Sequence, residues 1–324
     1  MTAPIFILSL PRSGSTLLQR LIATHPAVAT SSEPWLLLPL FLGFRDGHVF
    51  TNYRQRYLAQ AFSEFLGRLP DGAEAHRAAV RRFAGTLYGR ACTAGETHFL
   101  DKTPRYHLIA EELLQTFPDG RFILLWRNPL AVVSSCVETW ARGRWYLHHW
   151  RVDLYHGLSN LVELRRRFGD RVFTLRYEDL VTEPDRYVRA IFQYLDLPPA
   201  VDAVERYREV RLNGNMGDTR GHEAYPTVST ASRDRWPAVL ASPLRRAWAR
   251  RYLRWLGRDR LAVMGYDPEE LASQLAAQPR SWRSTLPDLV WTVYGRYAVA
   301  REPALFRRKR ALARRGLRID VASE

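Results

Sequence analysis

The feature that most constrains the fold is a turn of small polar residues between an apolar run and an amphipathic segment. Residues 5–10 are nearly all apolar, and the turn 11–16 (Pro-Arg-Ser-Gly-Ser-Thr) follows at once. Residues 17–22 then place Leu and Ile at the spacing of one helix face. A strand, a turn and a helix in this order direct backbone N–H groups toward an anion. The segment therefore predicts a phosphate-binding loop.

The side chains of this loop fit an anion. Gly14 lets the backbone approach closely, as no side chain intervenes. Ser15 and Thr16 offer hydroxyl groups, and Arg12 adds positive charge. The candidate binding residues of this segment are Arg12, Ser13, Gly14, Ser15, Thr16 and Leu17.

Further apolar runs alternate with helical patterns along the chain. Strands are expected at 97–100, 121–126 and 172–175, in addition to 5–10. Helices are expected at 106–116, 130–141, 150–168, 184–195 and 238–256, with two more between 53 and 92 that break at 70–72. Residues 28–50 are expected to be irregular, and the loop at 213–235 to close over cofactor or substrate. This alternation predicts an α/β fold whose central parallel β-sheet is flanked by helices and binds ligands at the strands' carboxyl ends.

The length and composition of the chain are those of a folded globular protein. With 324 residues, 46% of them hydrophobic, the chain is expected to form one domain over 1–268 and a helical basic extension over 269–324. Two cysteines do not make a disulfide framework. The start lacks the features of a signal peptide, and no apolar run reaches the roughly 18–20 residues that span a bilayer. We expect a soluble, cytoplasmic protein.

The net charge of +15 does not by itself indicate a nucleic-acid partner. Of the 48 basic residues 46 are arginine, a bias more typical of codon composition than of a DNA-binding patch. Residues 301–324 alone carry eight basic and three acidic side chains. They form either a solvated helix face or a peripheral contact with anionic lipids. Both interpretations stay open, and so does the oligomeric state.

A nucleotide kinase is the obvious rival for the phosphate loop. Its motif, G-x-x-x-x-G-K-[ST], needs a first glycine and a lysine that this loop lacks. The strand at 121–126 ends in Arg127 rather than in a metal-binding Asp. A nucleotide bound without a metal fits these residues better.

Two segments of the chain resemble the cofactor-binding motifs of one enzyme family. Residues 11–18 (PRSGSTLL) resemble the 5′-phosphosulfate loop of sulfotransferases that use 3′-phosphoadenosine-5′-phosphosulfate (PAPS). Residues 125–135 (LWRNPLAVVSS) resemble their 3′-phosphate motif. The resemblance, closest to the tyrosylprotein and bacterial branch, covers roughly residues 4–256. It implies a P-loop-containing nucleotide hydrolase-like fold in which Arg127 and Ser135 hold the 3′-phosphate.

The same resemblance extends to the end of the next strand and to a late loop. Tyr177 matches a strand-end pattern and would flank the adenine or the 3′-phosphate, although a half-buried packing tyrosine is an equal alternative. Ser232 and Arg235 resemble the segment that closes over the cofactor in bacterial relatives.

Two further residues match positions that take part in catalysis in this family. Glu33 follows a His-Pro pair as the general base does in the closest branch; a capping carboxylate is the alternative. Lys102 matches the family's lysine near the transferred group, and otherwise would be an exposed lysine at a strand end. With Arg12 it would stabilise the transferring oxygens. The catalytic residues implied are Glu33, Lys102 and Arg12.

The function implied is transfer of a sulfuryl group from PAPS, without a metal, to a small metabolite, glycan or lipid hydroxyl. Adenosine 3′,5′-bisphosphate would be released. Aromatic and histidine residues at 140–150 either line the acceptor pocket or pack in the core, and His222 and Glu223 are candidates to touch substrate. Two rivals remain: a kinase, and a non-catalytic basic protein that binds membranes or nucleic acid.

Overall fold

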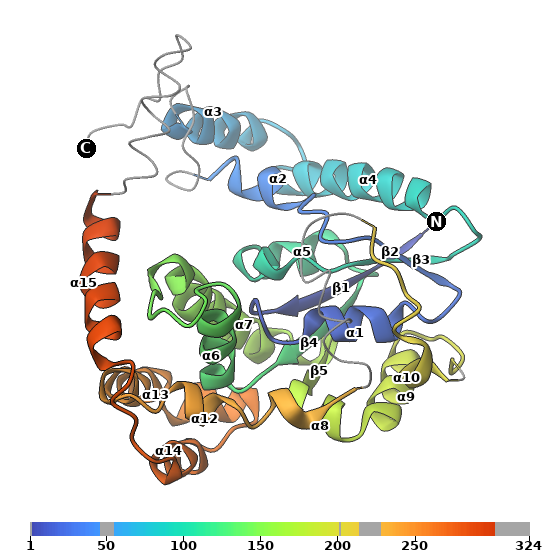
Figure 1. Ribbon diagram of the computed structural model, residues 1–324. Helices are drawn as coiled ribbons and strands as arrows, with labels where there is room; N and C mark the ends of the chain where they lie inside the picture. Colours follow the sequence, from blue (N-terminus) through green and yellow to red (C-terminus); the bar gives the residue numbers. More distant parts are fainter. Residues whose placement is uncertain (1, 46–54, 201, 214–227, 302–324) are drawn as a thin grey trace.

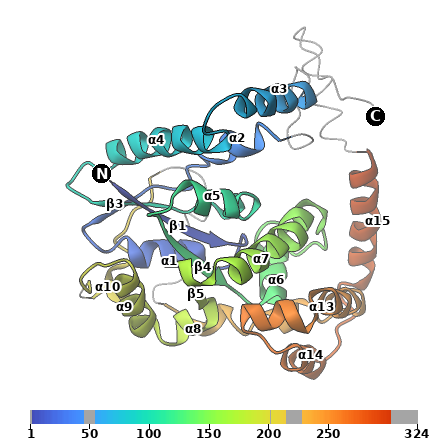
Figure 2. The ribbon, with the colours of Figure 1, turned by 180° about the vertical axis from the view of Figure 1, so that it is seen from behind.

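The centre of the molecule is a five-stranded sheet with the order β2-β3-β1-β4-β5 and purely parallel pairing. We describe a computed structural model, in which residues 2–45, 55–200, 202–213 and 228–301 are placed (Figures 1 and 2). The expected central parallel sheet is confirmed. The strands are β1 (Ala3–Ser9), β2 (Val28–Thr30), β3 (His98–Asp101), β4 (Arg121–Trp126) and β5 (Val172–Arg176).

Side chains on the strands alternate between two buried faces, as the period of a strand requires. On β1, Ile5 and Ile7 join one core cluster, while Phe6 and Leu8 join the other. Both faces are covered, so the strand is apolar throughout rather than alternately polar. This explains why the runs at 5–10 and 121–126 identified their strands.

Helices cover the two faces unequally. The face of Ile5 packs against α1 (Ser15–Ile22), α8 (Tyr177–Thr182), α9 (Pro184–Tyr194) and α10 (Ala203–Arg206). The face of Phe6 packs against α4 (Ala73–Ala91), α5 (Ala110–Thr116), α6 (Pro129–Thr139), α7 (Leu158–Arg167), α13 (Pro243–Met264) and α14 (Pro268–Ala277). α2 (Leu38–Leu42) and α12 (Trp236–Val239) also contribute buried side chains to the core on the Phe6 face, whereas no described side chain of α3 (Gln55–Gly67) or α15 (Thr285–Arg301) belongs to that cluster.

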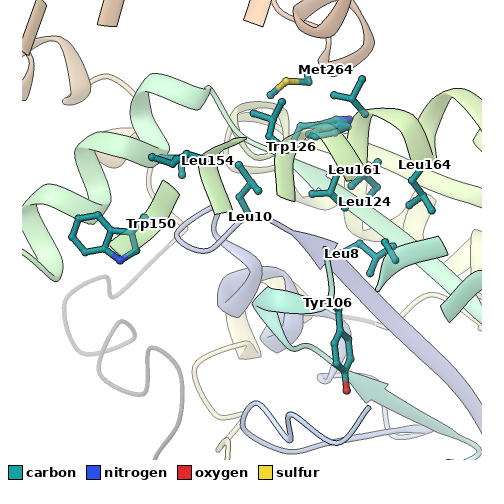
Figure 3. Close-up of a cluster of buried hydrophobic side chains, with 14 of the residues drawn as sticks. Leu8, Leu10, Tyr106, Leu124, Trp126, Trp150, Leu154, Leu161, Leu164 and Met264 are labelled. Atoms are coloured by element: carbon teal, nitrogen blue, oxygen red, sulfur yellow. The ribbon is translucent and has the colours of Figure 1, made fainter. Parts of the chain in front are cut away.

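The larger of the two cores joins distant parts of the chain. Figure 3 shows Leu8 and Leu124 from adjacent strands with Leu161 and Leu164 of α7 beside them. Met264 of α13 belongs to the same buried cluster. Leu271 and Leu275 of α14 are also buried in it. The predicted domain division after residue 268 stays a prediction.

The structure departs from the expected elements in several places. The helix expected at 106–116 is a 3₁₀-helical turn, Pro104–Leu108, followed by α5. The segment 28–50, expected to be irregular, contains β2 and α2, whose three and five residues are too short for a periodic pattern. Residues 150–168 are not one regular helix: a π-helical turn, Val152–Gly157, precedes α7. The helix expected at 238–256 is instead α13, which is kinked at Gly257, where φ is +66°. Within the described ranges, no helix is long and apolar enough to cross a membrane.

Candidate active site

Each strand of the sheet ends beside one residue that the sequence singled out. Arg12 follows β1, Glu33 follows β2, Lys102 follows β3, Arg127 follows β4 and Tyr177 follows β5. The strands are parallel, so all five residues lie at the same edge of the sheet. This is the edge where open α/β sheets bind ligands.

The predicted phosphate loop connects β1 to α1 by a sharp turn. Arg12 and Gly14 both have left-handed backbones, with φ of +65° and +91°. A Cβ atom on Gly14 would lie 2.3 Å from the Tyr177 ring, so this position has room only for glycine. Helix α1 begins at Ser15, and its N-cap residue, Gly14, has no side chain that could accept a hydrogen bond from the first N–H groups of the helix. These N–H groups therefore remain available to bind an anion.

The side chain of Arg12 crosses from the loop to α6. Its Nε donates to Ser135 Oγ at 3.2 Å, and one terminal nitrogen donates to Thr139 Oγ1 at 3.2 Å. Its guanidinium also lies 5.6 Å from the centre of the Trp140 ring. Arg12 and Ser135, predicted to hold opposite ends of one nucleotide, are thus hydrogen-bonded to each other.

Arg127 is buried and meets carbonyl groups instead of carboxylates. It donates to the Arg12 carbonyl at 2.7 Å and to the Ser232 carbonyl at 2.9 Å, and it stacks 4.5 Å from the centre of the Tyr177 ring. Its Nε is buried without a hydrogen-bond partner among the described residues. A buried cation in this setting favours a bound anion. Arg127 is therefore not a surface salt-bridge residue.

The late segment predicted to close over the cofactor reaches this place. Tyr177 Oη and Ser232 Oγ are 2.6 Å apart, and Tyr177 is buried against Gly14. Tyr177 thus both packs and flanks the loop. Arg235 instead lies on the surface, 3.7 Å from Glu138 of α6. The candidates His222 and Glu223, and most of the loop at 213–235, lie outside the described residues.

Two of the three candidate catalytic side chains, Lys102 and Glu33, form an ion pair. Lys102 Nζ lies 2.7 Å from Glu33 Oε1 and 3.4 Å from the hydroxyl of Thr16 in the phosphate loop. Lys102 is 2% exposed, which rules out an exposed strand-end lysine. The other oxygen of Glu33 accepts a hydrogen bond from the indole nitrogen of Trp35 at 3.2 Å. Carboxylate, ammonium and phosphate loop are therefore adjacent.

Sequence reasoning missed the contacts that position Glu33. The side-chain nitrogen of Gln19 on α1 donates to Thr30 Oγ1 at 2.8 Å and to the Ser31 carbonyl at 2.7 Å. These bonds fix the end of β2 just before Glu33. The helical pattern of α1 does not distinguish Gln19 from other polar residues. Its contacts arise because β2 pairs with β3, and the sequence did not reveal that pairing.

Asp101, the residue before Lys102, is the centre of a buried hydrogen-bond network. Asp101 accepts hydrogen bonds from Tyr88 at 2.6 Å, from Tyr106 at 2.8 Å and from Thr103 at 3.1 Å. Burial raises the pKa of Asp101 to about 6, against the opposing effect of these hydroxyl groups and of Lys102. The network joins α4 and the turn after Lys102 to the end of β3, and the sequence did not reveal these contacts.

The aromatic residues at 140–150 differ in burial, and those that are buried pack in the core as one of the two interpretations expects. Trp145 and Trp150 are buried in the large core, whereas Trp140 is 47% exposed beside Arg12. Tyr146 packs instead against Trp291 of α15, with ring centres 5.7 Å apart. Only Trp140 of these four lies directly against a predicted site residue.

Comparison with known proteins identifies the family. The model of the sulfotransferase family matches residues 4–202. The chain belongs to the sulfotransferase family. Nodulation protein NoeE of Sinorhizobium fredii is 32% identical to this sulfotransferase over 244 residues, which are 66% of the chain and 55% of that protein. The protein-tyrosine sulfotransferase of Drosophila melanogaster is 24% identical over 280 residues, covering 82% of the chain and 52% of that protein.

The sulfotransferase fold is also found among solved structures. The sulfotransferase domain from the curacin biosynthetic pathway superposes with a TM-score of 0.53 at 22% identity, covering 86% of this chain and 99% of that domain. This likeness establishes the fold, an α/β fold with a central parallel sheet. The chain spans about half the length of the two curated relatives described above.

Proposed function

We propose that this sulfotransferase transfers a sulfuryl group from PAPS to a hydroxyl group of an acceptor and releases adenosine 3′,5′-bisphosphate. The observation that carries the proposal is the buried Lys102–Glu33 ion pair beside Thr16 of the phosphate loop. It brings a base and a cation to one side of an anion site. Residues 11–18 resemble the 5′-phosphosulfate loop of PAPS-dependent sulfotransferases and residues 125–135 resemble their 3′-phosphate motif, which supports PAPS as the donor.

The residues present fit such a donor. The loop at 11–16 and the N–H groups of α1 would hold the 5′-phosphosulfate, and Arg127 with Ser135 the 3′-phosphate. The unpartnered Nε of buried Arg127 supports this assignment, because an anion would satisfy it. Tyr177 and Ser232 would then flank the nucleotide, while Arg235 is expected to contribute only through the closing segment.

Glu33 is proposed as the general base. PAPS, when bound, supplies the sulfuryl group. As the acceptor oxygen forms its new bond to sulfur, its proton passes to a carboxylate oxygen of Glu33, and the S–O bond to the leaving phosphate breaks. Among the described residues, each Glu33 oxygen accepts one hydrogen bond, from Lys102 or from Trp35, which leaves a lone pair for the acceptor hydroxyl.

Lys102 and Arg12 are proposed to neutralise charge. Lys102 orients the Glu33 carboxylate and lies within reach of the phosphate loop. Arg12 is held across the loop by Ser135 and Thr139, so its cation is preorganised rather than free to swing. Preorganised cations of this kind stabilise charge that develops during group transfer.

The acceptor is proposed to be a small metabolite, glycan or lipid. Two relatives are a nodulation protein and a protein-tyrosine sulfotransferase, so their names do not point to one common acceptor. Trp140, exposed beside Arg12, is the aromatic side chain best placed to contact it. Screening metabolites with labelled PAPS would identify the acceptor.

Calorimetry with adenosine 3′,5′-bisphosphate and with ATP–Mg²⁺ tests the donor. We expect the bisphosphate to bind at least about tenfold more tightly, because the loop lacks the lysine of a kinase. Arg127→Ala is expected to weaken the bisphosphate by about tenfold to a hundredfold through loss of charge-assisted bonds. Arg258→Ala, at a 79% exposed side chain, is the matched control and should change nothing. Preference for ATP–Mg²⁺ would contradict the proposal.

A further inference from the structure

Trp35 lies two residues after Glu33 and donates a hydrogen bond to its side chain. The indole nitrogen of Trp35 is 3.2 Å from Glu33 Oε2, and Lys102 Nζ is 2.7 Å from the other oxygen, Oε1. Each oxygen of the carboxylate therefore has a donor of its own. Because hydrogen bonds are directional, two donors on the two oxygens restrict the rotation of a carboxylate more than one donor does.

The backbone conformation of Trp35 is rare for a residue with a side chain. Pro34 has a fixed φ and restricts Glu33, the residue before it, to extended conformations. Trp35 follows with φ of +52°, in the left-handed region, which costs free energy for any residue except glycine. Such conformations persist only where surrounding contacts hold them, and they cluster at functional sites.

Two hydroxyl groups of the Asp101 network hold the segment that carries Trp35. The backbone N–H of Trp35 donates to Thr103 Oγ1 at 3.3 Å, and that of Leu37 donates to Tyr106 Oη at 3.3 Å. Both hydroxyl groups in turn donate to the buried carboxylate of Asp101. The side chain of Trp35 is also partly buried against the larger core. The left-handed backbone of Trp35 is therefore held from the end of β3.

The two donors to Glu33 differ in what else they contact. Lys102 Nζ also lies 3.4 Å from the hydroxyl of Thr16 in the phosphate loop, so its charge acts on two groups. Trp35 is neutral, and the one N–H of its indole is directed to Glu33. Trp35 therefore orients the carboxylate without adding charge to the site.

We propose that Trp35 is a positioning residue, which holds the Glu33 carboxylate in the orientation that accepts a proton from the acceptor hydroxyl. The inference rests on the proposed function of Glu33 as general base. A base held in the productive orientation reacts faster than one that rotates freely. The Asp101 network acts on the reaction through Trp35, because its hydroxyl groups fix the Trp35 backbone.

The variant Trp35→Phe removes the indole N–H and keeps an aromatic ring. The probes are 4-nitrophenol and water, to which sulfuryl transfer from labelled PAPS gives 4-nitrophenyl sulfate and inorganic sulfate. We expect kcat to fall about threefold to tenfold, the effect of one neutral hydrogen bond, while affinity for adenosine 3′,5′-bisphosphate stays within about twofold. Trp248→Phe, at another partly buried tryptophan packed against the same core, is the matched control and should change neither.

A second set of variants separates positioning from a loss of packing. In a Glu33→Gln background, Trp35→Phe should lower turnover no further, because it acts through the carboxylate. A loss of packing would instead lower turnover by the same factor in both backgrounds. Thr103→Val removes the hydroxyl group that accepts from the Trp35 N–H and should lower kcat as well, whereas Thr103→Ser keeps that group and should retain near-normal kcat.

Crystal structures of the unaltered chain and of Trp35→Phe test the orientation of Glu33 directly, even where turnover of both probes is too slow to measure. We expect the Glu33 carboxylate to rotate about its last bond in the variant. An unchanged carboxylate, or an equal loss of turnover in both backgrounds, would overturn the inference. Near-normal turnover of Trp35→Phe beside a large loss in Glu33→Gln would overturn the role of Trp35 and keep the proposed reaction. Near-normal turnover of both variants would overturn the role of Glu33 as base together with that of Trp35.

Discussion

The ammonium nitrogen of Lys102 lies 2.7 Å from a carboxylate oxygen of Glu33, in a place where the two side chains are only 2% and 9% exposed. The residues come from the ends of neighbouring strands, β3 and β2. A buried pair is weak evidence for net stability, but removal of one partner leaves an uncompensated charge. We therefore derive two predictions from this ion pair, one for kcat and one for the free energy of unfolding.

Replacement Glu33→Gln is expected to lower kcat by about a hundredfold or more, because the amide does not accept the acceptor's proton. Affinity for adenosine 3′,5′-bisphosphate should stay within about twofold, since the shape of the site is kept and the change affects a proposed proton transfer. Turnover with labelled PAPS and calorimetry measure the two effects. Glu209→Gln, at a 68% exposed side chain, is the control. Near-normal turnover of Glu33→Gln would remove its role as base.

Replacement Lys102→Met is expected to lower the free energy of unfolding by about 3 kcal/mol, because Glu33 keeps a buried charge without its partner. The double variant Lys102→Met/Glu33→Gln should recover part of this loss. Urea unfolding of the four proteins gives the coupling energy directly. Additive effects of the two substitutions would show that the ion pair contributes no coupling in the folded chain.

The fold and the loop residues were accessible from sequence because their determinants are local. A run such as 121–126 is apolar on both faces of the sheet, and the glycine and hydroxyl residues at 13–16 lie within one turn. Parallel strands also bring their ends to one edge. The convergence of Arg12, Lys102 and Arg127 therefore follows once each strand is recognised.

Other parts depend on contacts between distant residues and were missed for that reason. β2 has three residues, and its identity comes from pairing with β3 seventy positions later. The hydroxyl groups around Asp101 come from α4 and from the turn after β3. The direct bond between Arg12 and Ser135 likewise spans the sheet edge. Periodicity within one segment does not encode such pairings.

Replacement Gly14→Ala is expected to weaken adenosine 3′,5′-bisphosphate by more than about tenfold. The new methyl group would meet the Tyr177 ring at 2.3 Å, in a backbone with φ of +91°, so the loop or the ring must move. Gly95→Ala is a close control, because its φ is +89° and no atom lies within 4 Å of the added Cβ. It should destabilise by about 1 kcal/mol and leave the affinity unchanged. Equal affinities in calorimetry would show that Gly14 has no special role.

The raised pKa of Asp101 leads to a pH dependence of the free energy of unfolding. Its sign is unusual for a carboxylate, because stability falls as the pH rises. Burial raises its pKa from 3.8 to about 6, so between these values the folded chain holds a proton that the unfolded chain has released. Its contribution to the free energy of unfolding is therefore largest at acid pH. It declines by about 2–3 kcal/mol as the pH rises through 6, and changes little above that.

The variant Asp101→Asn isolates this contribution, because the amide occupies the same place and does not titrate. Other groups, such as His107 with its pKa lowered by burial, affect both proteins equally. We therefore expect Asp101→Asn to gain stability relative to the unaltered chain as the pH rises from 4 to 7, by about 2–3 kcal/mol. Urea unfolding at a series of pH values measures the difference, with Asp119→Asn, at an exposed position, as control. A difference that stays constant over this range would mean that Asp101 is ionised throughout, and that the hydroxyl groups of Tyr88, Tyr106 and Thr103 fully compensate its burial.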